Sequence, residues 1–408
     1  MYSAEQARAL FPALNQYHDG YQVCFLDGPG GTQIPERVSE AMRNYFDGGN
    51  SNLGGVFACS ADTGRLVEKA RQTAADFVNA PSGDHMAFGA NMTSLTFSLS
   101  RAISRDWKAG DEIIVSSLDH FANVSPWQMA AEDKGVIVKS LTMSADECQL
   151  DLKQLSSLIS KRTKLIAVTC ASNLTGTIVD VQKIVTLAKK MGAKVYLDAV
   201  HFAPHQLIDV QAFGCDFLVC SAYKFFGPHL GIAYIASPWL DQLRPYKVKP
   251  APEKGPARFE TGTLNFEALA GFNAAVNYLA SWSVKSTLRE RLEECYHHYL
   301  HHEERLSAHF LSKLDGVDGV SLHGTKNSQH RTPTFALSFD DMSPQTIAEG
   351  LAKKHIYVWN GHFYAVEAVK TLNKLEGGGV LRVGFMHYNT EDEIDRFFSA
   401  LVDVMSVE

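Results

Sequence analysis

The chain has 408 residues, of which 45% are hydrophobic and 20% are charged, a composition typical of a folded protein rather than a disordered or collagen-like one. The formal net charge is −7 and no basic run occurs, so neither nucleic acid nor an anionic membrane is expected as a partner. No signal or transit peptide pattern opens the chain, and no apolar segment reaches the roughly 20 residues that cross a bilayer. The seven cysteines lack paired spacing, which favours reduced thiols and a cytoplasmic location.

The first predicted elements alternate with glycine-rich turns. Gln22–Leu26 has the pattern of a short strand and runs into Asp27-Gly-Pro-Gly-Gly31, where the glycines allow close backbone approach. Helical spacing of apolar residues follows in Ile34–Phe46 and Thr63–Val78. Between these helices, Gly48–Gly55 is a loop rich in glycine and amide side chains, and such a loop either binds a ligand or is simply flexible.

From residue 85 to residue 235, strand-like apolar runs alternate with helical stretches. The strand candidates are His85–Gly89, Glu112–Ser116, Val136–Leu141, Leu165–Thr169, Lys194–Leu197, Phe217–Cys220 and Gly231–Ile235. The helical stretches are Ser94–Arg105, Asn123–Lys134, Asp151–Ile159 and Val181–Met191. This alternation predicts an α/β fold with a mainly parallel sheet, whose ligands gather at the carboxyl ends of the strands. The short connection between the last two candidates also allows one of them to run antiparallel.

The remaining sequence predicts a second, smaller unit. Lys247–Ala257 contains three prolines and reads as a surface loop. Residues 266–310 have a helical pattern, and strand candidates follow at Phe335–Phe339, Tyr357–Trp359 and Val380–Phe385. We therefore expect a large cofactor-binding domain over residues 1–265, whose opening segment can pack on the other domain, and a small α/β domain over residues 266–408.

Two of the predicted strands end in polar residues that suit cofactor chemistry. Asp198 and His201 follow one strand, and Ser221 and Lys224 follow the next. A lysine amine can form a Schiff base with pyridoxal phosphate, while a carboxylate keeps the pyridine nitrogen protonated so that the ring withdraws electrons from a substrate carbanion. A plain ion pair between Asp198 and Lys224 is the structural alternative.

Three further segments fit the same chemistry. Gly89–Ser94 follows a strand and opens a helix, so its first amides and the hydroxyls of Thr93 and Ser94 can cradle a phosphate. His120 follows the next strand, where its imidazole can lie flat on an aromatic cofactor or can cap the loop. Asn173 follows Leu165–Thr169, where it can bind a ring oxygen or merely form a turn.

These segments, in this order, resemble the class V aminotransferase family of pyridoxal-phosphate enzymes, and within it the cysteine desulfurase and selenocysteine lyase branch. The resemblance runs from Leu26-Asp27 to Met386-His-Tyr-Asn-Thr390, and its most specific part is Asp198-Ala-Val-His201 with Ser221-Ala-Tyr-Lys224. It implies fold type I, a pyridoxal 5'-phosphate cofactor, a small amino-acid substrate and a homodimer.

The resemblance also implies roles for individual residues. Lys224 would be the Schiff-base lysine, Asp198 the partner of the pyridine nitrogen and His120 the group stacked on the ring. The phosphate would be held by Thr93, Ser94 and Ser221, together with Thr263 of the neighbouring subunit. The ring oxygen would lie between Asn173 and His201, and His201 stands where many relatives carry glutamine. The substrate would be bound by Arg382, Asn52 and His362. Bidentate geometry is the reason that an arginine suits a substrate carboxylate.

One departure from that family concerns sulfur. Desulfurases supply a cysteine from a mobile loop near the equivalent of Val358–His362, yet no cysteine occurs between residues 296 and 408. Because only a thiolate can accept sulfur as a persulfide, persulfide chemistry from that loop is excluded. Trp359 stands where desulfurases often have an arginine, which puts their mode of substrate binding in doubt, and Cys59 is the one plausible substitute thiol.

The histidines at positions 297, 298, 301 and 302 raise the question of a metal site. Spacing of four residues places two pairs on one helix face, but the neighbouring glutamates indicate a solvated helix. We expect no metal site here.

The sequence therefore predicts a pyridoxal-phosphate enzyme acting on an amino acid, with cleavage of a carbon–sulfur bond at the β-carbon as the leading reaction. An aminotransferase or an epimerase of the same family is the first alternative, because all three reactions share one carbanion. A non-catalytic protein that binds pyridoxal phosphate or an amino acid is the second.

Overall fold

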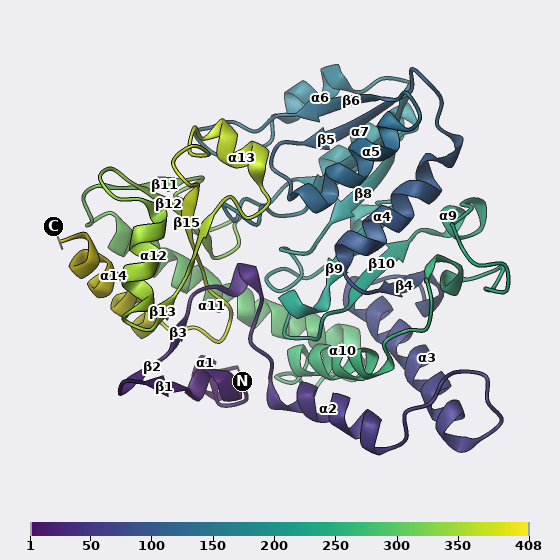
Figure 1. Ribbon diagram of the computed structural model, residues 1–408, viewed down its shortest axis with the longest axis horizontal. Coiled ribbons are helices and arrows are strands. Elements are labelled where there is room, and N and C mark those ends of the chain that lie inside the picture. The colour runs from purple at the N-terminus through teal and green to yellow at the C-terminus, as the bar shows by residue number, and fades with distance from the viewer. Residues whose placement is uncertain (1, 407–408) are drawn as a thin grey trace.

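The computed structural model describes residues 2–406 and contains two main sheets (Figure 1). The larger sheet has seven strands in the order β4-β10-β9-β8-β7-β5-β6. Their bounds are β4 Met86–Gly89, β5 Glu112–Ser116, β6 Ile137–Leu141, β7 Thr163–Thr169, β8 Lys194–Asp198, β9 Phe217–Ser221 and β10 Gly231–Ile235. Strands β6, β5, β7, β8 and β9 pair in parallel, whereas β10 runs antiparallel to both β9 and β4. The predicted mainly parallel sheet is confirmed.

Helices cover both faces of this sheet, because successive strand residues point to opposite faces and nearly all of them are apolar. Val195 and Leu197 belong to the core cluster on one face, while Tyr196 between them belongs to the cluster on the other. The first face is covered by α3 (Ala58–Val78), α6 (Leu152–Leu158), α7 (Val181–Met191), α8 (Val210–Phe213) and α10 (Phe266–Leu279). The second is covered by α4 (Met92–Ile103), α5 (Ser125–Glu132) and α9 (Ser237–Gln242).

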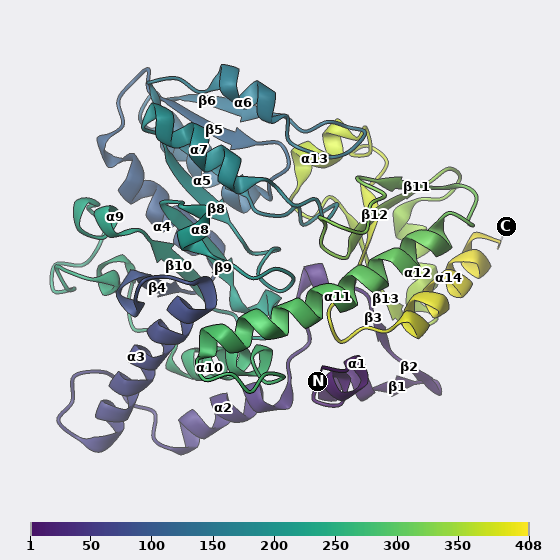
Figure 2. The same cartoon turned by 180° about the vertical axis from the view of Figure 1, so that it is seen from behind.

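The smaller sheet is antiparallel and has the order β11-β12-β15-β14. Its strands are β11 Val320–His323, β12 Thr334–Phe339, β14 Trp359–Gly361 and β15 Val380–Gly384. Around it lie α12 (Pro344–Ala352), α13 (Val366–Thr371) and α14 (Glu391–Met405). The 27-residue helix α11 (Leu288–Leu314) runs from α10 to this second lobe and joins the two sheets at the back of the molecule (Figure 2).

The opening segment lies against the second lobe, as Figure 1 shows. It contains α1 (Ala4–Arg8), β1 (Tyr17–His18), β2 (Tyr21–Gln22) and β3 (Cys24–Phe25), and β3 pairs in parallel with β13 (Ile356–Tyr357). Arg8 of this segment forms an ion pair of 2.8 Å with Glu393 of α14. Helix α2 (Glu36–Asp47) then leads back to the first lobe, where it packs with α10.

Some elements differ from the sequence prediction. The apolar run Tyr357–Trp359 is divided between β13 and β14, which pair with different strands. Helix α3 begins at Ala58, five residues before Thr63. The domain boundary between residues 265 and 266 stays a prediction, and α10, which follows it, packs against α2 and α3. Within residues 2–406, no helix is both long enough and apolar enough to cross a membrane.

Candidate active site

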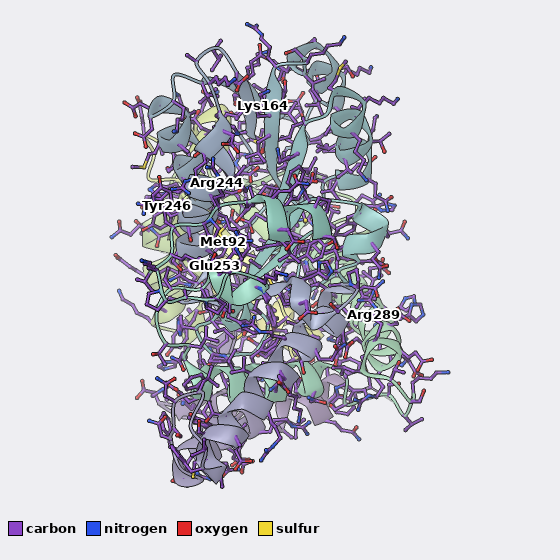
Figure 3. The ribbon with its side chains drawn as sticks, turned by 90° about the vertical axis from the view of Figure 1, so that its right-hand side faces the viewer. Met92, Lys164, Arg244, Tyr246, Glu253 and Arg289 are labelled. Carbon is purple, nitrogen blue, oxygen red and sulfur yellow. The ribbon has the colours of Figure 1, made fainter. Side chains whose placement is uncertain are left out.

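A cavity of about 610 Å³ opens between the carboxyl ends of the sheet strands and the second lobe. Its walls come from the turn after β3, the start of α4, the ends of β7, β8 and β9, and β15 with the segment before α13. In Figure 3, Met92 at the start of α4 lies near the centre of the molecule, whereas Lys164 at the amino end of β7 lies near the top. The cavity therefore lies at the sheet edge where parallel-stranded folds bind their ligands.

Lys224 ends the short 3-10 turn Ala222–Lys224 that follows β9. Its Nζ donates hydrogen bonds to the carbonyl oxygens of Pro29, at 2.6 Å, and Gly30, at 2.9 Å. Burial, together with the nearby Arg382 cation, lowers the pKa of Lys224 to about 7, while the carboxylates of Asp198 and Asp27 oppose the shift. A buried amine that gives up its proton near neutral pH can act as a nucleophile or a base.

Asp198 is the last residue of β8 and is buried at the cavity wall. Its Oδ1 accepts a hydrogen bond of 2.8 Å from the Val200 amide, and this is the one hydrogen bond that its carboxylate makes to the described residues. Burial raises the pKa of Asp198 to about 6, against the effects of the Val200 amide and Lys224. No ion pair joins Asp198 to Lys224 among residues 2–406, since Lys224 uses backbone carbonyls instead.

The start of α4 has the geometry of an anion site. The hydroxyl of Thr93 lines the cavity, and the Met92 amide donates a 2.9 Å hydrogen bond to Oγ of Ser221. The amides of Met92 and Ser94 already donate to Ser221 and Asn91, so the Thr93 amide and the positive dipole at the amino end of this 12-residue helix are left for an anion. Ser94 instead completes the capping box, because its Oγ bonds both the amide and the carbonyl of Asn91.

His120 forms one side wall of the cavity. Its Nδ1 accepts a 3.0 Å hydrogen bond from the Ala122 amide, and its ring stacks on Tyr364 with centroids 5.1 Å apart. Burial lowers the pKa of His120 to about 4, with the Lys224 and Arg382 cations adding to the effect. The imidazole is therefore neutral at physiological pH and suits stacking better than ion pairing.

Asn173 and His201 lie near each other along the same wall. Nδ2 of Asn173 donates a 3.0 Å hydrogen bond to the Phe363 carbonyl oxygen. The backbone carbonyl of Asn173 accepts a 2.9 Å hydrogen bond from Nη1 of Arg382. His201 is buried, with Nε2 placed 3.0 Å from Oγ1 of Thr332. Burial lowers the pKa of His201 well below its usual range.

Arg382, on β15, is buried and faces the cavity. The Phe363 ring covers its guanidinium at 4.0 Å, and its Nε has no hydrogen-bond partner in the described part of the chain. Burial lowers the pKa of Arg382 to about 9, although the neighbouring Asp27 carboxylate opposes this. A buried cation with a free donor can hold an anionic substrate group.

Four predicted site residues lie outside this cavity. Ser94 caps its helix, as described above. Asn52 and Thr263 line a separate hollow, formed by residues 50–52 and 263–267. His362 is exposed, and its Nδ1 accepts a hydrogen bond from the Tyr364 amide at 3.1 Å. None of these four residues lines the cavity of its own chain, so their predicted roles stay predictions.

The structure adds Tyr223 and His229, which the sequence did not indicate, to the cavity and shows that Trp359 also lines it. Tyr223 and His229 stack at 4.8 Å beside Lys224, and Trp359 lies over Gly30, where a Cβ would come within 2.6 Å of the indole nitrogen. Asp27 lies close to Trp359, Lys224 and Arg382, and burial raises the pKa of its carboxyl to about 6 against their effect. The Gly-Pro dipeptide before His229 is the one signal that could have marked that residue.

Neither sulfur nor metal ligands gather in the cavity as far as the described chain extends. No cysteine lines it, and six of the seven cysteines are buried elsewhere, the exception being Cys59. Cys59 is the second residue of α3, and its Sγ lies 4.0 Å from the Gly48 carbonyl oxygen. Residues 2–406 contain no group of three or more possible metal ligands, and His297 and His301 form an exposed pair on α11.

The fold is an α/β scaffold, and one cavity at the strand ends is lined by a lysine, a carboxylate and the amino end of a helix. Comparison with known proteins makes this specific. The aminotransferase class-V family model matches residues 24–397, and the chain belongs to that family. The predictions of the family, of fold type I and of a pyridoxal-phosphate-dependent enzyme are confirmed.

The relatives that match nearly the whole chain are cysteine desulfurases. One from Escherichia coli O9:H4 is 29% identical over 420 residues, covering 98% of both chains. A solved apo cysteine desulfurase from Thermococcus onnurineus NA1 has a TM-score of 0.89 at 25% identity and covers 99% of this chain and 98% of its own. A solved Escherichia coli cysteine desulfurase has a TM-score of 0.85 at 26% identity and covers 100% of this chain and 99% of its own.

Proposed function

We propose that the protein is a pyridoxal-phosphate-dependent lyase that cleaves the carbon–sulfur bond of a cysteine-type amino acid and keeps no sulfur on itself. The observation that carries this proposal is the cavity itself: Lys224, Asp198 and Arg382 line it, and none of the described cysteines does. The similarity to cysteine desulfurases supports the substrate class.

The residues present fit pyridoxal 5'-phosphate. The hydroxyl and amide of Thr93 and the hydroxyl of Ser221 suit its phosphate, and Lys224 suits its aldehyde. One carboxylate oxygen of Asp198 makes no hydrogen bond to the described residues and suits the pyridine nitrogen. When bound, this cofactor supplies an electron sink for the carbanion at the substrate α-carbon. His120, which is neutral, suits the ring face.

The chain's own groups then carry the proton transfers. Arg382 binds the substrate carboxylate, and Lys224 takes the α-proton, since an amine with a pKa of about 7 is largely unprotonated slightly above neutrality. The Cβ–S bond breaks with its electron pair on sulfur, and the sulfur takes a proton and leaves as sulfide or a small thiol. Water then converts the three-carbon remainder into pyruvate and ammonia, so no oxidant or reductant is consumed.

We also propose a homodimer in the cytoplasm. Thr263 and Asn52 line one hollow away from the cavity, as is expected if they serve the site of a second copy. Two-fold pairing is the commonest oligomeric arrangement of soluble proteins. The absence of a disulfide among the described cysteines agrees with a reducing compartment.

The test is the visible spectrum of the purified protein with pyridoxal phosphate, before and after borohydride reduction. We expect the label on Lys224, and we expect Lys224→Ala to remove the covalent band. The matched control is Lys194→Ala, because Lys194 is a half-buried lysine at the opposite end of the neighbouring strand β8. A label that maps elsewhere, or a Lys224→Ala protein that keeps the band, would contradict the assignment.

The products distinguish this reaction from its alternatives. With cysteine or S-substituted cysteines, a lyase releases pyruvate, whereas an aminotransferase needs a keto acid and an epimerase returns the D-amino acid. Persistent spectral change without any product would indicate a binding protein.

A further inference from the structure

Behind the cavity, α11 carries a buried acid that the proposed reaction does not use. Oε2 of Glu303 lies 2.9 Å from Nδ1 of His205, and the two side chains are 3% and 0% exposed. Within residues 2–406, neither Oε1 of Glu303 nor Nε2 of His205 has another partner. A buried pair of this kind is weak evidence for stability alone, because removing both groups from water costs as much as their attraction returns.

The pair contacts a residue of the cavity wall. His205 packs edge-on against His201, with ring centroids 5.3 Å apart and an interplanar angle of 69°. The two histidines are four residues apart in a helical turn after β8, closed by the hydrogen bond from the Ala203 amide to the Ala199 carbonyl at 2.8 Å. This spacing puts both rings on one side of the turn.

One ring nitrogen of His201 is hydrogen-bonded to the protein and the other makes no hydrogen bond to the described residues. Nε2 lies 3.0 Å from Oγ1 of Thr332 and 3.1 Å from Oγ1 of Thr334. Nδ1 makes no hydrogen bond to the described residues and is left for a group in the cavity. Because threonine hydroxyls both donate and accept, they allow Nδ1 either to hold or to lack a proton.

Helix α11 holds this turn at two points. The Tyr296 hydroxyl donates to the Ala203 carbonyl at 2.7 Å, and Glu303, seven residues later on the same helix face, holds His205. Figure 2 shows α11 crossing behind the first lobe toward the second. The turn that carries His201 is therefore fastened to the helix that joins the two sheets.

We propose that Glu303 and His205 are positioning residues, which set the orientation and charge of His201 toward the ring oxygen of the bound cofactor. The proposal rests on the proposed function, because His201 can act in this way only where the cofactor is bound.

Charged and titratable groups surround each member of this chain. His201 faces His205 of its own turn, Arg382 of β15 and Lys224 after β9, and positive charge on these groups adds to burial in keeping its imidazole neutral. The Glu303–His205 pair faces Tyr2, Tyr296 and His387. Burial raises the pKa of Glu303, and its contact with His205 opposes that shift. The charge that the pair carries acts on His201 through the ring of His205, which packs against it.

The experiment titrates the visible absorbance of the lysine-bound cofactor against pH in the intact holoenzyme. Replacing Glu303 with Gln removes the carboxylate that holds His205, so we expect the midpoint to move by about half a unit to one unit. The matched control is Glu304→Gln, because Glu304 is the next residue on α11 and is partly exposed beside His301. We expect the control to keep the wild-type midpoint.

A second background tests whether Glu303 acts through His201. When His201 is already Gln, adding Glu303→Gln should produce no further shift. An unmoved midpoint in Glu303→Gln, or the same shift in the His201→Gln background, overturns the inference.

Folding and cofactor binding provide separate readouts. If Glu303→Gln does not fold, the pair Glu303→Leu with His205→Phe replaces the buried polar groups by apolar ones of similar size, which buried pairs often tolerate, and a shift of the midpoint is expected here too. Wild-type protein that binds no cofactor overturns the proposed function as well. A wild-type protein that binds it, with midpoints unmoved by these substitutions, overturns this inference alone.

Discussion

Lys224 is the residue of the cavity whose environment bears most directly on the proposed reaction, because it lowers the pKa of the amine. Its side chain is buried with Arg382 nearby, and its Nζ has two backbone carbonyls as partners. The carbonyls hold the amine in place, but they stabilise its positive charge less than a carboxylate contact would. The lysine is consequently poised to change protonation state close to neutral pH.

This has a measurable effect on the stability of the apoprotein. The folded pKa of Lys224, about 7, is below its ordinary value of 10.5. Between these values the unfolded chain binds one proton more than the folded chain, so the free energy of unfolding rises as pH increases from 7 toward 10.5. Lys224→Met should flatten this part of the curve in denaturant titrations, and an unchanged slope would contradict the buried, neutral lysine.

Residues that follow the predicted strands could be predicted from the sequence, whereas the direction of the side chains in residues 362–364 could not. Asp198, Ser221 and Lys224 were found because an apolar run fixes where a buried strand ends, and parallel strands end at one edge. His362 lies beside Phe363 and Tyr364, which both have positive φ. No periodic pattern specifies where such a segment directs its side chains.

At the scale of elements, the start of α4 depends on close packing against β10. Gly231, the first residue of β10, has no room for a side chain, since a Cβ there would lie 2.4 Å from the Asn91 carbonyl carbon. Asn91 caps α4, and its displacement would move Met92 and Thr93, which suit the phosphate.

We therefore expect Gly231→Ala to weaken cofactor affinity about tenfold or more, because loss of a single charge-assisted hydrogen bond already costs about that much. Fluorescence titration of the apoprotein with pyridoxal phosphate measures this. Gly64→Ala is the control, as a Cβ on that residue of α3 meets nothing within 4 Å. Equal affinity in the two variants would show that the helix start does not hold the phosphate.

Element boundaries were less predictable than element types. The seven strands of the large sheet were recognised because each is short, apolar and bounded by polar residues. The apolar run Tyr357–Trp359 predicts one strand, but Tyr357 pairs with Phe25 and Trp359 pairs with Arg382. Apolar content shows that a segment is buried but does not show which partner it pairs with.

At the scale of the whole molecule, the hollow containing Asn52 and Thr263 has a neighbouring apolar segment. Leu53 and Phe57 are 46% and 59% exposed, and Val56 between them is fully exposed. Exposed apolar residues that cluster beside a polar hollow are typical of an interaction surface. A second copy of the chain would cover them and would complete the site with Thr263. The homodimer and the role of Thr263 are predictions from the family resemblance of the sequence, whereas the exposed apolar residues beside the hollow are a feature of the structure.

We expect sedimentation to show a dimer at micromolar concentration. The double substitution Val56→Asp with Phe57→Asp should favour the monomer and weaken cofactor binding at the same time. Val284→Asp serves as the control, because Val284 is also fully exposed but lies between α10 and α11. A wild-type monomer that turns over substrate would remove Thr263 from the site.

The fate of sulfur tests the central claim most directly. The measurement is the intact mass of the protein after turnover of cysteine and of S-substituted cysteines without reductant, with the released products assayed in parallel. We predict an unchanged protein mass, with pyruvate, ammonia and a free thiol or sulfide in solution, because six cysteines are buried and none lines the cavity within the described residues. An added mass of one sulfur atom on Cys59, together with loss of activity in Cys59→Ser, would contradict the account and indicate a desulfurase that uses a different thiol.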